Sequence, residues 1–408
     1  MSRKRPKLAL SSVRVSNFKA IRQSKTVRFT PLTVFIGDNG SGKSSLLEAL
    51  ETMQLMSEQG LDAAMNRWRG FEFVWNQTAR ANAKQRKLKH PHSLEPSLFL
   101  YSNPVRFEVG GHVSSHDYKL KYRAMTEISL EQHRKGQSIL ISDEFASLES
   151  LSKMERYSVR GAVSLEYRDG RDEDRHDYLE LPEGESALSR VLGGFLDEWQ
   201  FVLLAPDFMG SPTPQKRTSG AVKLARDGSN IADYLREIFD QNLTAFEGII
   251  ETFKAVVPFA RDLQTQVAQE LQRIVYLEMT EANFKLPGWM LSTGTIRVLA
   301  IIALLRHPKP PPIIFIEELE NGLDPRTLNL IVEEIRRAVE SERTQVVITT
   351  HSPYLLDLLS LSQIVVVERV NGQPVFTRPA DHDSLDAWLE KFSPGQLYTM
   401  GRLRGGQT

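Results

Sequence analysis

Hydrophobic and polar residues alternate in two different ways along the chain, and together they predict an α/β fold. Residues 13–17, 27–29 and 32–36 have the short apolar patterns of strands, and the last of these leads into a glycine-rich turn. Apolar side chains then recur at helical spacing through residues 44–56, which predicts a helix directly after the turn. The last third alternates again, with predicted helices at 295–306 and 326–339 and predicted strands at 313–316, 345–349 and 364–368.

The middle of the chain lacks this regular alternation. From residue 80 to residue 204, charged stretches are mixed with strand-like pieces, and the segment 101–131 is long enough for several antiparallel strands. A stretch rich in Ser, Pro and Thr, 209–220, predicts an exposed loop. The remaining patterns predict strands at 162–167, 178–181 and 273–279 and helical structure at 231–257.

This organisation predicts one α/β domain with a mixed β-sheet, interrupted by an insertion of strands and helices. The expected divisions are an N-terminal part of the domain at 1–90, an inserted strand-rich region at 91–205, a helical region at 206–285, a C-terminal part of the domain at 286–380 and a tail at 381–408.

Composition narrows the classes of protein that the chain can represent. Lys plus Arg number 51 and Asp plus Glu number 51, so the formal net charge is zero, which excludes a uniformly basic nucleic-acid coat but leaves room for a local basic patch. The absence of cysteine excludes disulfides, thiolate metal sites and cysteine nucleophiles. No apolar run reaches the roughly 18–20 residues needed to cross a bilayer, and no apolar signal core follows the basic start. We therefore expect a soluble cytoplasmic protein without membrane contact.

The clearest chemical motif follows the predicted strand 32–36. Residues 37–44 read Gly-Asp-Asn-Gly-Ser-Gly-Lys-Ser and fit the phosphate-binding pattern G-x-x-x-x-G-K-[ST] between a strand and a helix. The glycines let the backbone N–H groups point at phosphate oxygens, and the helix dipole favours the same anion. The Lys places a cation on the β and γ oxygens, and the last Ser offers a hydroxyl to Mg²⁺. The nucleotide-binding residues expected here are Asn39, Gly40, Gly42, Lys43, Ser44 and Ser45.

A second motif is the acidic end of the predicted strand 313–316. Glu317 and Glu318 follow it directly, and Glu320 and Asp324 come later in the same loop. A Mg²⁺–nucleotide site needs one acidic group near the metal and can use a second to orient or deprotonate water. Successive strand residues point to opposite faces, so the pair can divide these roles. Taken alone, two glutamates here would indicate a solvated strand terminus, and it is the phosphate loop that favours the functional reading.

Two further segments are ambiguous when each is read alone. Ser292 and Gly294 stand at the start of an apolar helix, where they fit either a plain N-cap or a close approach of a ligand to the helix terminus. His351 follows the predicted strand 345–349, where it is either structural or placed at the edge at which open α/β sheets bind ligands.

In order and spacing, these segments resemble the ABC ATPase family. Lys43 lies in a Walker A motif, Glu317 and Glu318 are similar to Walker B, and residues 291–295, Leu-Ser-Thr-Gly-Thr, look like the ABC signature. Asp324 matches the D-loop and His351 matches the switch histidine. The resemblance implies an ABC-type P-loop ATPase head.

Three segments narrow the resemblance to the RecF, SMC and OLD-like branch. The opening Val-Arg-Val-Ser-Asn-Phe-Lys-Ala at 13–20 resembles the start of such ATPases. Glu-Glu-Leu-Glu-Asn-Gly-Leu-Asp-Pro at 317–325 and Thr-Thr-His-Ser-Pro at 349–353 are similar to stand-alone OLD-like proteins, as is the segment 224–235. The likeness is strong at both ends of the chain and weak in the middle.

The chain departs from the pattern in two respects. Walker B usually offers Asp at the Mg²⁺ position, where this chain has Glu317, whose longer arm changes the metal geometry. OLD nucleases continue into a Toprim domain, and the residues after His351 are too few for one, so we expect no nuclease centre in this chain. A Q-loop glutamine is expected after the strand that follows the Walker A helix; the candidate is Gln77, after residues 71–75, with an exposed loop glutamine as the alternative.

The resemblance implies ATP and Mg²⁺ as cofactors and ATP hydrolysis as the activity. It implies Ser44, Glu317 and Gln77 as metal ligands and Glu318 as the residue that orients or deprotonates the attacking water, with His351 contacting the γ-phosphate. It further implies a homodimer or higher even oligomer in which each ATP lies between two chains. The side chains that would then contribute to nucleotide binding across the interface or beside it are Ser292, Gly294, Thr295 and Asp324.

Four functions fit these observations to different degrees. We expect a regulatory ATPase of a bacterial anti-phage or toxin–antitoxin-like system, controlling a nuclease or toxin supplied by another protein. The alternative is a DNA-repair or DNA-maintenance ATPase of the RecF or SMC kind, for which DNA would be a partner. A transporter ATPase fits poorly, since the span from Lys43 to Leu291 is long for that class, and a scaffold without ATPase activity is the fourth reading. The best candidate for a DNA-binding groove, which also fits a solvated face, is the basic run Arg80, Lys84, Arg86, Lys87 and Lys89.

Overall fold

A computed structural model of the chain shows two compact units, each made of segments that are distant in sequence. Unit 1 contains Met1–Thr30, Gly37–Trp199 and Val366–Thr377, and unit 2 contains Pro31–Ile36, Gln200–Val365 and Arg378–Thr408. The structure describes residues 7–87, 99–114, 119–133, 136–149, 152–156, 162–168, 174–182, 184–216, 221–268, 273–381 and 385–403.

Unit 1 is built on an eleven-stranded sheet whose described pairs are all antiparallel. Its main path runs β12-β11-β10-β9-β8-β7-β1-β2, so the first strand of the chain belongs to the same sheet as the strands expected in the insertion. The insertion therefore extends a sheet that the N-terminus begins. The strands are β1 (Lys7–Phe18), β2 (Ile21–Gln23), β3 (Val27–Arg28), β5 (Gln85–Lys87), β6 (Phe99–Tyr101), β7 (Val105–Ser114), β8 (Lys119–His133), β9 (Gly136–Leu148), β10 (Ser152–Arg156), β11 (Ala162–Arg168) and β12 (Asp174–Glu180).

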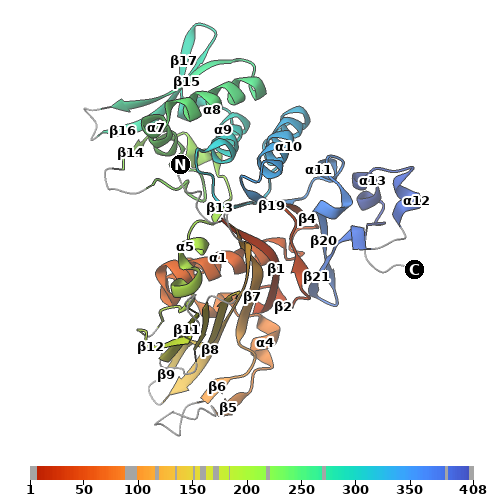
Figure 1. Ribbon diagram of the computed structural model, residues 1–408. Helices are drawn as coiled ribbons and strands as arrows, with labels where there is room; N and C mark the ends of the chain where they lie inside the picture. The colour runs from red at the N-terminus through yellow and green to blue at the C-terminus, as the bar shows by residue number, and fades with distance from the viewer. Residues whose placement is uncertain are drawn as a thin grey trace. The chain divides into compact units, whose positions relative to one another are not determined.

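The helices of unit 1 follow the phosphate loop. Helix α1 (Lys43–Gln59) contacts β1 and β7, and the alternating burial of β7 shows that one face of that strand is covered (Figure 1). The helix predicted at 44–56 is confirmed. After it come α2 (Leu61–Arg67), α3 (Phe71–Val74), α4 (Gln77–Ala81), the π-helical turn η1 (Ser189–Gly193) and α5 (Gly194–Leu196).

The strand expected at 71–75 is wrong, because these residues form helix α3 and its C-cap. Gly70, with φ 125°, lets the chain turn into the helix. Phe71 and Trp75, four residues apart, bring their rings to 5.4 Å between centroids, and Phe71 and Val74 are buried at helical spacing. Aromatic and β-branched residues favour a strand by propensity, but packing on this helical face decides the outcome.

Unit 2 contains a parallel sheet of buried strands in the order β13-β18-β19-β4, followed by the start of β20. The register aligns Val202 with Ile316, Ile316 with Ile348, and Thr350 with Ile36, so the strands end at one edge. The residues after these strands therefore gather at the edge where α/β sheets bind ligands. The strands are β13 (Gln200–Val202), β18 (Ile313–Ile316), β19 (Gln345–Thr350), β4 (Leu32–Ile36) and β20 (Ile364–Val370).

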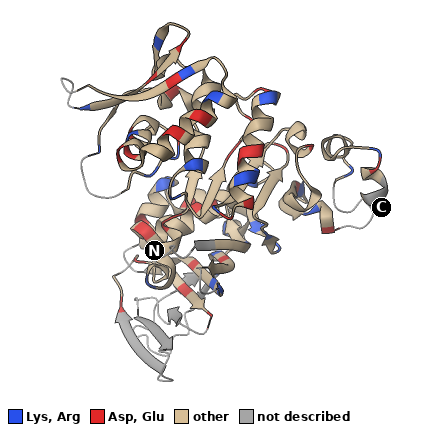
Figure 2. Cartoon of the chain, turned by 45° about the horizontal axis from the view of Figure 1, so that its top comes forward, with Lys and Arg blue, Asp and Glu red and all other residues tan. Residues whose placement is uncertain are grey.

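Two long helices accompany this parallel sheet. Helix α9 (Thr293–Arg306) is buried along nearly its whole length and contacts α8 (Leu243–Val256) and α10 (Pro325–Glu340). Helix α10 is amphipathic, and Figure 2 shows acidic and basic residues interspersed along the helices. The predicted elements of the last third are thus confirmed to within a few residues.

A smaller antiparallel sheet completes unit 2, with the order β14-β16-β15 and β17 paired to β16. The expected helical region at 206–285 therefore contains strands as well as helices. The helical pattern at 231–257 divides at Asn242, whose side chain accepts a hydrogen bond from Ala245 N and caps α8. The elements are α6 (Pro206–Met209), β14 (Thr213–Pro214), α7 (Ile231–Gln241), β15 (Ala260–Ala268), β16 (Ile274–Glu281) and β17 (Phe284–Pro287).

The expected exposed loop at 209–220 is only partly correct. Met209 is fully buried, and β14 pairs with β16 through Thr213 and Pro214. Residues 217–220 lie outside the described part of the chain. The other elements are β21 (Gln373–Thr377) in unit 1 and, in unit 2, η2 (Gly288–Met290), α11 (Pro353–Leu356), η3 (Leu361–Gln363), η4 (Pro379–Asp381), α12 (Asp386–Leu389) and α13 (Pro394–Thr399). Among the described residues, the helices are too short or too polar to span a bilayer.

Candidate functional site

The phosphate loop connects the end of β4 to helix α1. Gly42 is the N-cap of this helix with φ 112°, and neither a side-chain hydrogen bond nor an acidic residue is present in its first turn. The N–H groups at the start of this 17-residue helix are therefore not capped by a side chain, which suits an anion. Gly40 has φ 73°, and a Cβ added there would meet no atom within 4 Å, so the loop leaves open space at that position.

The hairpin β20–β21 explains two other glycines of the loop. A Cβ at Gly37 would lie 2.1 Å from the carbonyl oxygen of Val367, and a Cβ at Gly42 would lie 2.6 Å from the ring of Pro374. The loop is therefore packed against residues more than 300 positions later in the chain. The sequence carries no signal for this contact, because only pairing of the C-terminal strands places them there.

The polar side chains of the loop fit a bound phosphate. Lys43 is buried, and its Nζ donates to the carbonyl oxygens of Gly37 at 2.6 Å and Asp38 at 3.1 Å. Ser41 Oγ is buried and has no hydrogen-bond partner within the described structure. Ser44 is exposed at the first turn of α1, whereas Ser45 is buried. An uncapped helix terminus with a lysine in its first turn suits an anion such as a phosphate.

The two glutamates after β18 have different environments. Glu317 is 8% exposed, and its Oε1 lies 2.5 Å from Nη2 of Arg226. Glu318 has φ 52°, and its N–H donates to Thr349 Oγ1 at 3.0 Å. The left-handed conformation turns the chain immediately after the strand. The division of roles between the two carboxylates stays a prediction.

Arg297 is a functional candidate that sequence reasoning missed. It lies on α9, is 5% exposed, and donates to the carbonyl oxygens of Leu204 at 2.9 Å and Glu318 at 3.0 Å. Burial lowers the pKa of its guanidinium, while the nearby Glu318 and Glu320 oppose that shift. It ties the signature helix to the backbone of Glu318.

Ser292 at the signature is an N-cap, as the plain reading predicted. Its Oγ accepts a hydrogen bond from Thr295 N at 3.2 Å and lies 2.7 Å from Thr295 Oγ1. Ser292 remains exposed, but Thr295 is buried behind it, so a direct contact of Thr295 with a nucleotide stays a prediction. At Gly294, a Cβ would lie 2.4 Å from the carbonyl oxygen of Gly322. Gly294 thus lets the loop after β18 approach the start of α9 closely. The sequence alternative was a ligand in that position.

The loop after β18 also reaches the predicted switch histidine. Glu320 Oε1 accepts from the backbone N–H of His351 at 2.5 Å, and Glu320 Oε2 is buried without a hydrogen-bond partner in the described structure. Asp324 caps α10 by accepting from the N–H groups of Arg326 at 3.0 Å and Thr327 at 3.1 Å. Hydrogen bonds from Thr327, first from its hydroxyl, lower the pKa of Asp324.

Gln77 stands at the first turn of α4 and is exposed. Its Nε2 donates to the carbonyl oxygen of Glu72 at 3.2 Å, a local contact within the same stretch of helices. Its role as a metal ligand stays a prediction. Unit 2 contains the segments predicted to be the signature, the two glutamates, the D-loop and the switch histidine, and unit 1 contains the phosphate loop and Gln77.

This fold and these motifs define a P-loop ATPase domain of the ABC type. Residues 32–357 match the model of a family described as "AAA domain, putative AbiEii toxin, Type IV TA system", and the chain belongs to this family. Its fold is similar to that in the crystal structure of the SmcHead bound to the C-winged helix domain of ScpA, with a TM-score of 0.53, 14% identity and coverage of 90% of this chain and 97% of that one.

Curated relatives match over a shorter region. ABC transporter G family member 44 of Oryza sativa subsp. japonica is 26% identical over 175 residues, which is 41% of this chain and 12% of the relative. Pleiotropic drug resistance protein 2 of Nicotiana plumbaginifolia is 26% identical over 155 residues, 36% of this chain and 10% of the relative. The chain spans about an eighth or less of the length of these relatives.

Proposed function

We propose that the chain hydrolyses ATP in a Mg²⁺-dependent reaction and does so as a nucleotide-sandwich dimer. The observation that carries the proposal is the fixed position of Glu318, whose N–H binds Thr349 and whose carbonyl oxygen binds Arg297. A carboxylate held on rigid backbone beside a buried acidic neighbour suits general-base chemistry.

The roles of the residues follow from the family mechanism of positioning and charge stabilisation. When bound, Mg²⁺–ATP supplies the γ-phosphoryl group and the positive charge that its transfer requires. Lys43 and the N–H groups of the first turn of α1 would hold the phosphates, while Ser44 and Glu317 would hold the metal. Glu318 orients the attacking water and accepts its proton, and His351 contacts the phosphate that is lost on hydrolysis.

The test of the base is the substitution Glu318→Gln. The amide keeps the shape of the side chain and cannot accept the proton, so we expect turnover to fall by about 10²–10⁴-fold while ATP binding persists. ATPase assays, binding of a fluorescent ATP analogue and light scattering would report turnover, affinity and accumulation of the closed dimer. The matched control Glu340→Gln, at an exposed position of α10, should retain activity. Wild-type turnover in the Glu318 variant would overturn the assignment.

The sandwich arrangement is supported by the exposed start of α9, where Ser292 and Thr293 face solvent although the rest of the helix is buried. In this arrangement the signature of one chain binds the nucleotide held by the Walker A loop of its partner. Ser292 and the N–H groups near Gly294 would then meet the γ-phosphate from the second chain.

For the biological role, we propose a regulatory ATPase of the OLD-like kind that controls a separate nuclease or toxin in bacterial anti-phage defence. The description of the family as a toxin–antitoxin AAA domain supports this proposal. Co-expression of the chain with its genomic neighbours should protect cells from phage, and Lys43→Ala should abolish protection. Equal plaque counts with and without the chain, across a phage panel, would contradict the defence role.

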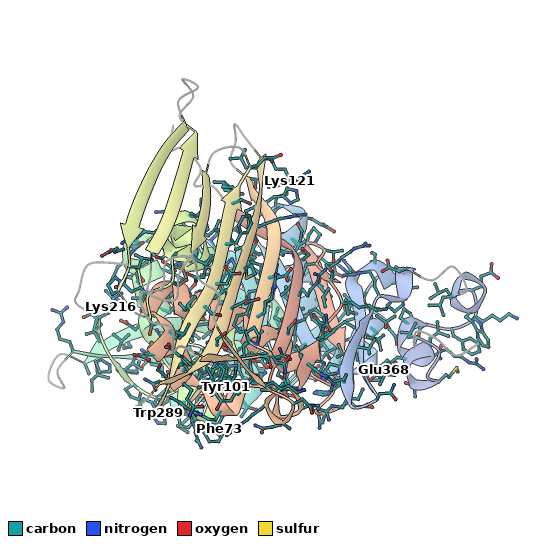
Figure 3. All side chains as sticks on the ribbon, turned by 90° about the horizontal axis from the view of Figure 1, so that it is seen from below. Phe73, Tyr101, Lys121, Lys216, Trp289 and Glu368 are labelled. Carbon is teal, nitrogen blue, oxygen red and sulfur yellow. The ribbon has the colours of Figure 1, made fainter. Side chains whose placement is uncertain are left out.

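A DNA-maintenance role is the second candidate. The SMC-head-like fold favours it, together with three exposed basic residues at alternate positions of β8: Lys119, Lys121 and Arg123. Figure 3 shows Lys121 at one end of the long sheet and Tyr101 at the other. Burial first, and then Lys119 and Lys121, lower the pKa of nearby His112, while Glu149 opposes that shift. In the basic run predicted earlier, Arg80 and Lys84 are exposed, and the other three side chains lie outside the described ones.

Duplex binding separates the two roles. A DNA-maintenance protein should bind duplex DNA with an affinity that falls steeply with salt, and the charge reversals Lys119→Glu and Lys121→Glu should flatten that dependence. Fluorescence anisotropy at several salt concentrations would measure both effects, with Lys254→Glu on α8 as a control. Absence of binding at low salt would exclude this candidate.

A further inference from the structure

The buried glutamate of Walker B is paired with an arginine from a distant segment. Arg226 Nη2 donates to Glu317 Oε1 at 2.5 Å, and the two side chains are 24% and 10% exposed. The pair therefore lies mostly out of water, where an ion pair is screened less than at the surface. Its acidic member is the residue expected to hold the metal.

The backbone holds Arg226 firmly in place. Its carbonyl oxygen accepts from Leu203 N at 2.7 Å, and the next carbonyl oxygen, of Asp227, accepts from Ala205 N at 2.9 Å. These bonds attach the segment to the residues directly after β13, the strand that pairs with β18. Arg226 is therefore placed at the same sheet edge as Glu317.

The turn after Arg226 is fixed as well. Asn230 Oδ1 accepts from Ala225 N at 2.7 Å, Asp227 Oδ1 accepts from Ser229 N at 3.0 Å, and Gly228 has φ 76°. These local hydrogen bonds preorganise the turn before α7 begins. Because backbone and turn are both fixed, only the Arg226 side chain needs to move for Glu317 to change partner.

An arginine and a divalent cation compete for a carboxylate because both need its lone pairs and both neutralise its charge. The hydrogen-bonded pair offsets the cost of burying the Glu317 carboxylate. A metal that binds the same oxygen must first displace the guanidinium. The free energy of the Arg226–Glu317 ion pair therefore opposes metal binding.

We propose that Arg226 is an internal counter-ion of the Walker B glutamate, which Mg²⁺ displaces from Glu317 when Mg²⁺–ATP binds. Arg226 thereby sets how much Mg²⁺ strengthens nucleotide binding. The inference rests on the proposed function, since it takes Glu317 as the metal-holding residue. It assigns to the segment 224–230 a role in the site that its sequence did not specify.

The test compares nucleotide affinity with and without metal, independently of turnover. The dissociation constant of a fluorescent non-hydrolysable ATP analogue is measured in EDTA and in Mg²⁺, and the ratio of the two values is the metal enhancement. We expect Arg226→Ala to raise this ratio about tenfold, because a charge-assisted hydrogen bond no longer competes. The matched control Arg236→Ala, which removes the ion-pair partner of the exposed Asp240 on α7, should leave the ratio unchanged.

Two further measurements guard against a folding defect. Removing Arg226 leaves a buried carboxylate without this counter-ion, so thermal stability in EDTA should fall, and Mn²⁺ with the analogue should restore more of it than in the wild type. Glu317→Gln removes the shared partner, so adding Arg226→Ala to it should no longer change the metal enhancement. An unchanged or smaller ratio in Arg226→Ala would overturn the inference, whereas a wild-type chain that binds no nucleotide would instead refute the proposed function.

Discussion

At the scale of single residues, the site depends on neighbours that a motif does not reveal. Glu317 and Glu318 are adjacent in sequence, yet one pairs with Arg226 and the other is held through its backbone by Thr349 and Arg297. The motif predicts two carboxylates with separate roles. These three partners come from three other segments, and the Glu318 carboxylate also accepts a hydrogen bond from the nearby Asn321.

Ser292 allows a sharp test of the sandwich at this scale. Ser292→Arg adds bulk at the signature and also loses the N-cap, which costs about 1 kcal/mol. We expect it to block dimerisation and ATP turnover while leaving ATP affinity of the single chain unchanged. The control Ser292→Ala loses the cap and the hydroxyl contact with phosphate without adding bulk. Its melting temperature should fall as far, and dimerisation should weaken less than in the arginine variant because the N–H groups near Gly294 remain accessible. ATPase activity equal to that of wild type in the arginine variant would remove the role in trans.

The half-buried His307 makes the free energy of unfolding depend on pH. Burial lowers the pKa of His307 in the folded chain, so the unfolded chain binds its proton more tightly. The contribution of neutral His307 to the free energy of unfolding is complete above its pKa in the unfolded chain, near 6.5. It is lost as the pH falls below that value toward the lower pKa of the folded chain. Urea unfolding at pH 7.5 and 5.5 should show a smaller loss for His307→Gln than for the wild type. An identical loss in both proteins would show that other groups control this range.

At the scale of elements, the start of α9 is organised by packing with the loop after β18. Gly294 is needed because the carbonyl oxygen of Gly322 takes the space of a side chain, and Arg297 fixes the loop from the same helix. The start of α9 is therefore closely packed against the loop after β18 as well as being a helix terminus.

The substitution Gly294→Ala tests this close packing between the start of α9 and the loop after β18. A Cβ at 2.4 Å from the carbonyl oxygen of Gly322 forces the backbone apart, so we expect a loss of roughly 1–3 kcal/mol in unfolding free energy. Gly248→Ala on α8, where a Cβ meets nothing within 4 Å, is the matched control and should stabilise by up to about 1 kcal/mol. Equal stability of the two variants would contradict the packing argument.

Elements with strong periodicity were predictable, and those decided by context were not. The apolar strand 32–36, the helix after it and the strand 313–316 match the structure because their patterns fit a single environment. Residues 71–75 have strand-forming side chains, but Phe71–Val74 form a helix and only Trp75, its extended C-cap, pairs as a bridge with Phe18. The helical pattern at 231–257 contains two helices because Asn242 begins a new one.

At the scale of the whole molecule, the chain crosses between its two units five times, and each unit is built from segments far apart in sequence. Unit 1 includes the hairpin of Val366–Thr377, which packs against Gly37 and Gly42 of the phosphate loop. Neither unit is a continuous stretch. The domain divisions expected from the sequence stay predictions.

A fragment of residues 1–199 tests this interleaving. Without the hairpin, the phosphate loop loses the residues that its glycines pack against, so we expect no measurable ATP binding and a broad unfolding transition. Appending residues 366–377 through a flexible linker should restore part of both. Circular dichroism and nucleotide titration would measure them, and wild-type affinity in the bare fragment would contradict the prediction.

The sequence by itself determined the α/β class, the phosphate loop, the acidic end of β18 and the order of the motifs. These features depend on local periodicity and on short motifs, which need no knowledge of distant contacts. Only the tertiary structure decided that the insertion extends the first sheet, that the carbonyl oxygen of Gly322 packs against Gly294, and that Arg226 forms an ion pair with Glu317. Each of these depends on strand pairing or close packing between segments far apart in the chain, and hydrophobic pattern alone does not specify which segments meet.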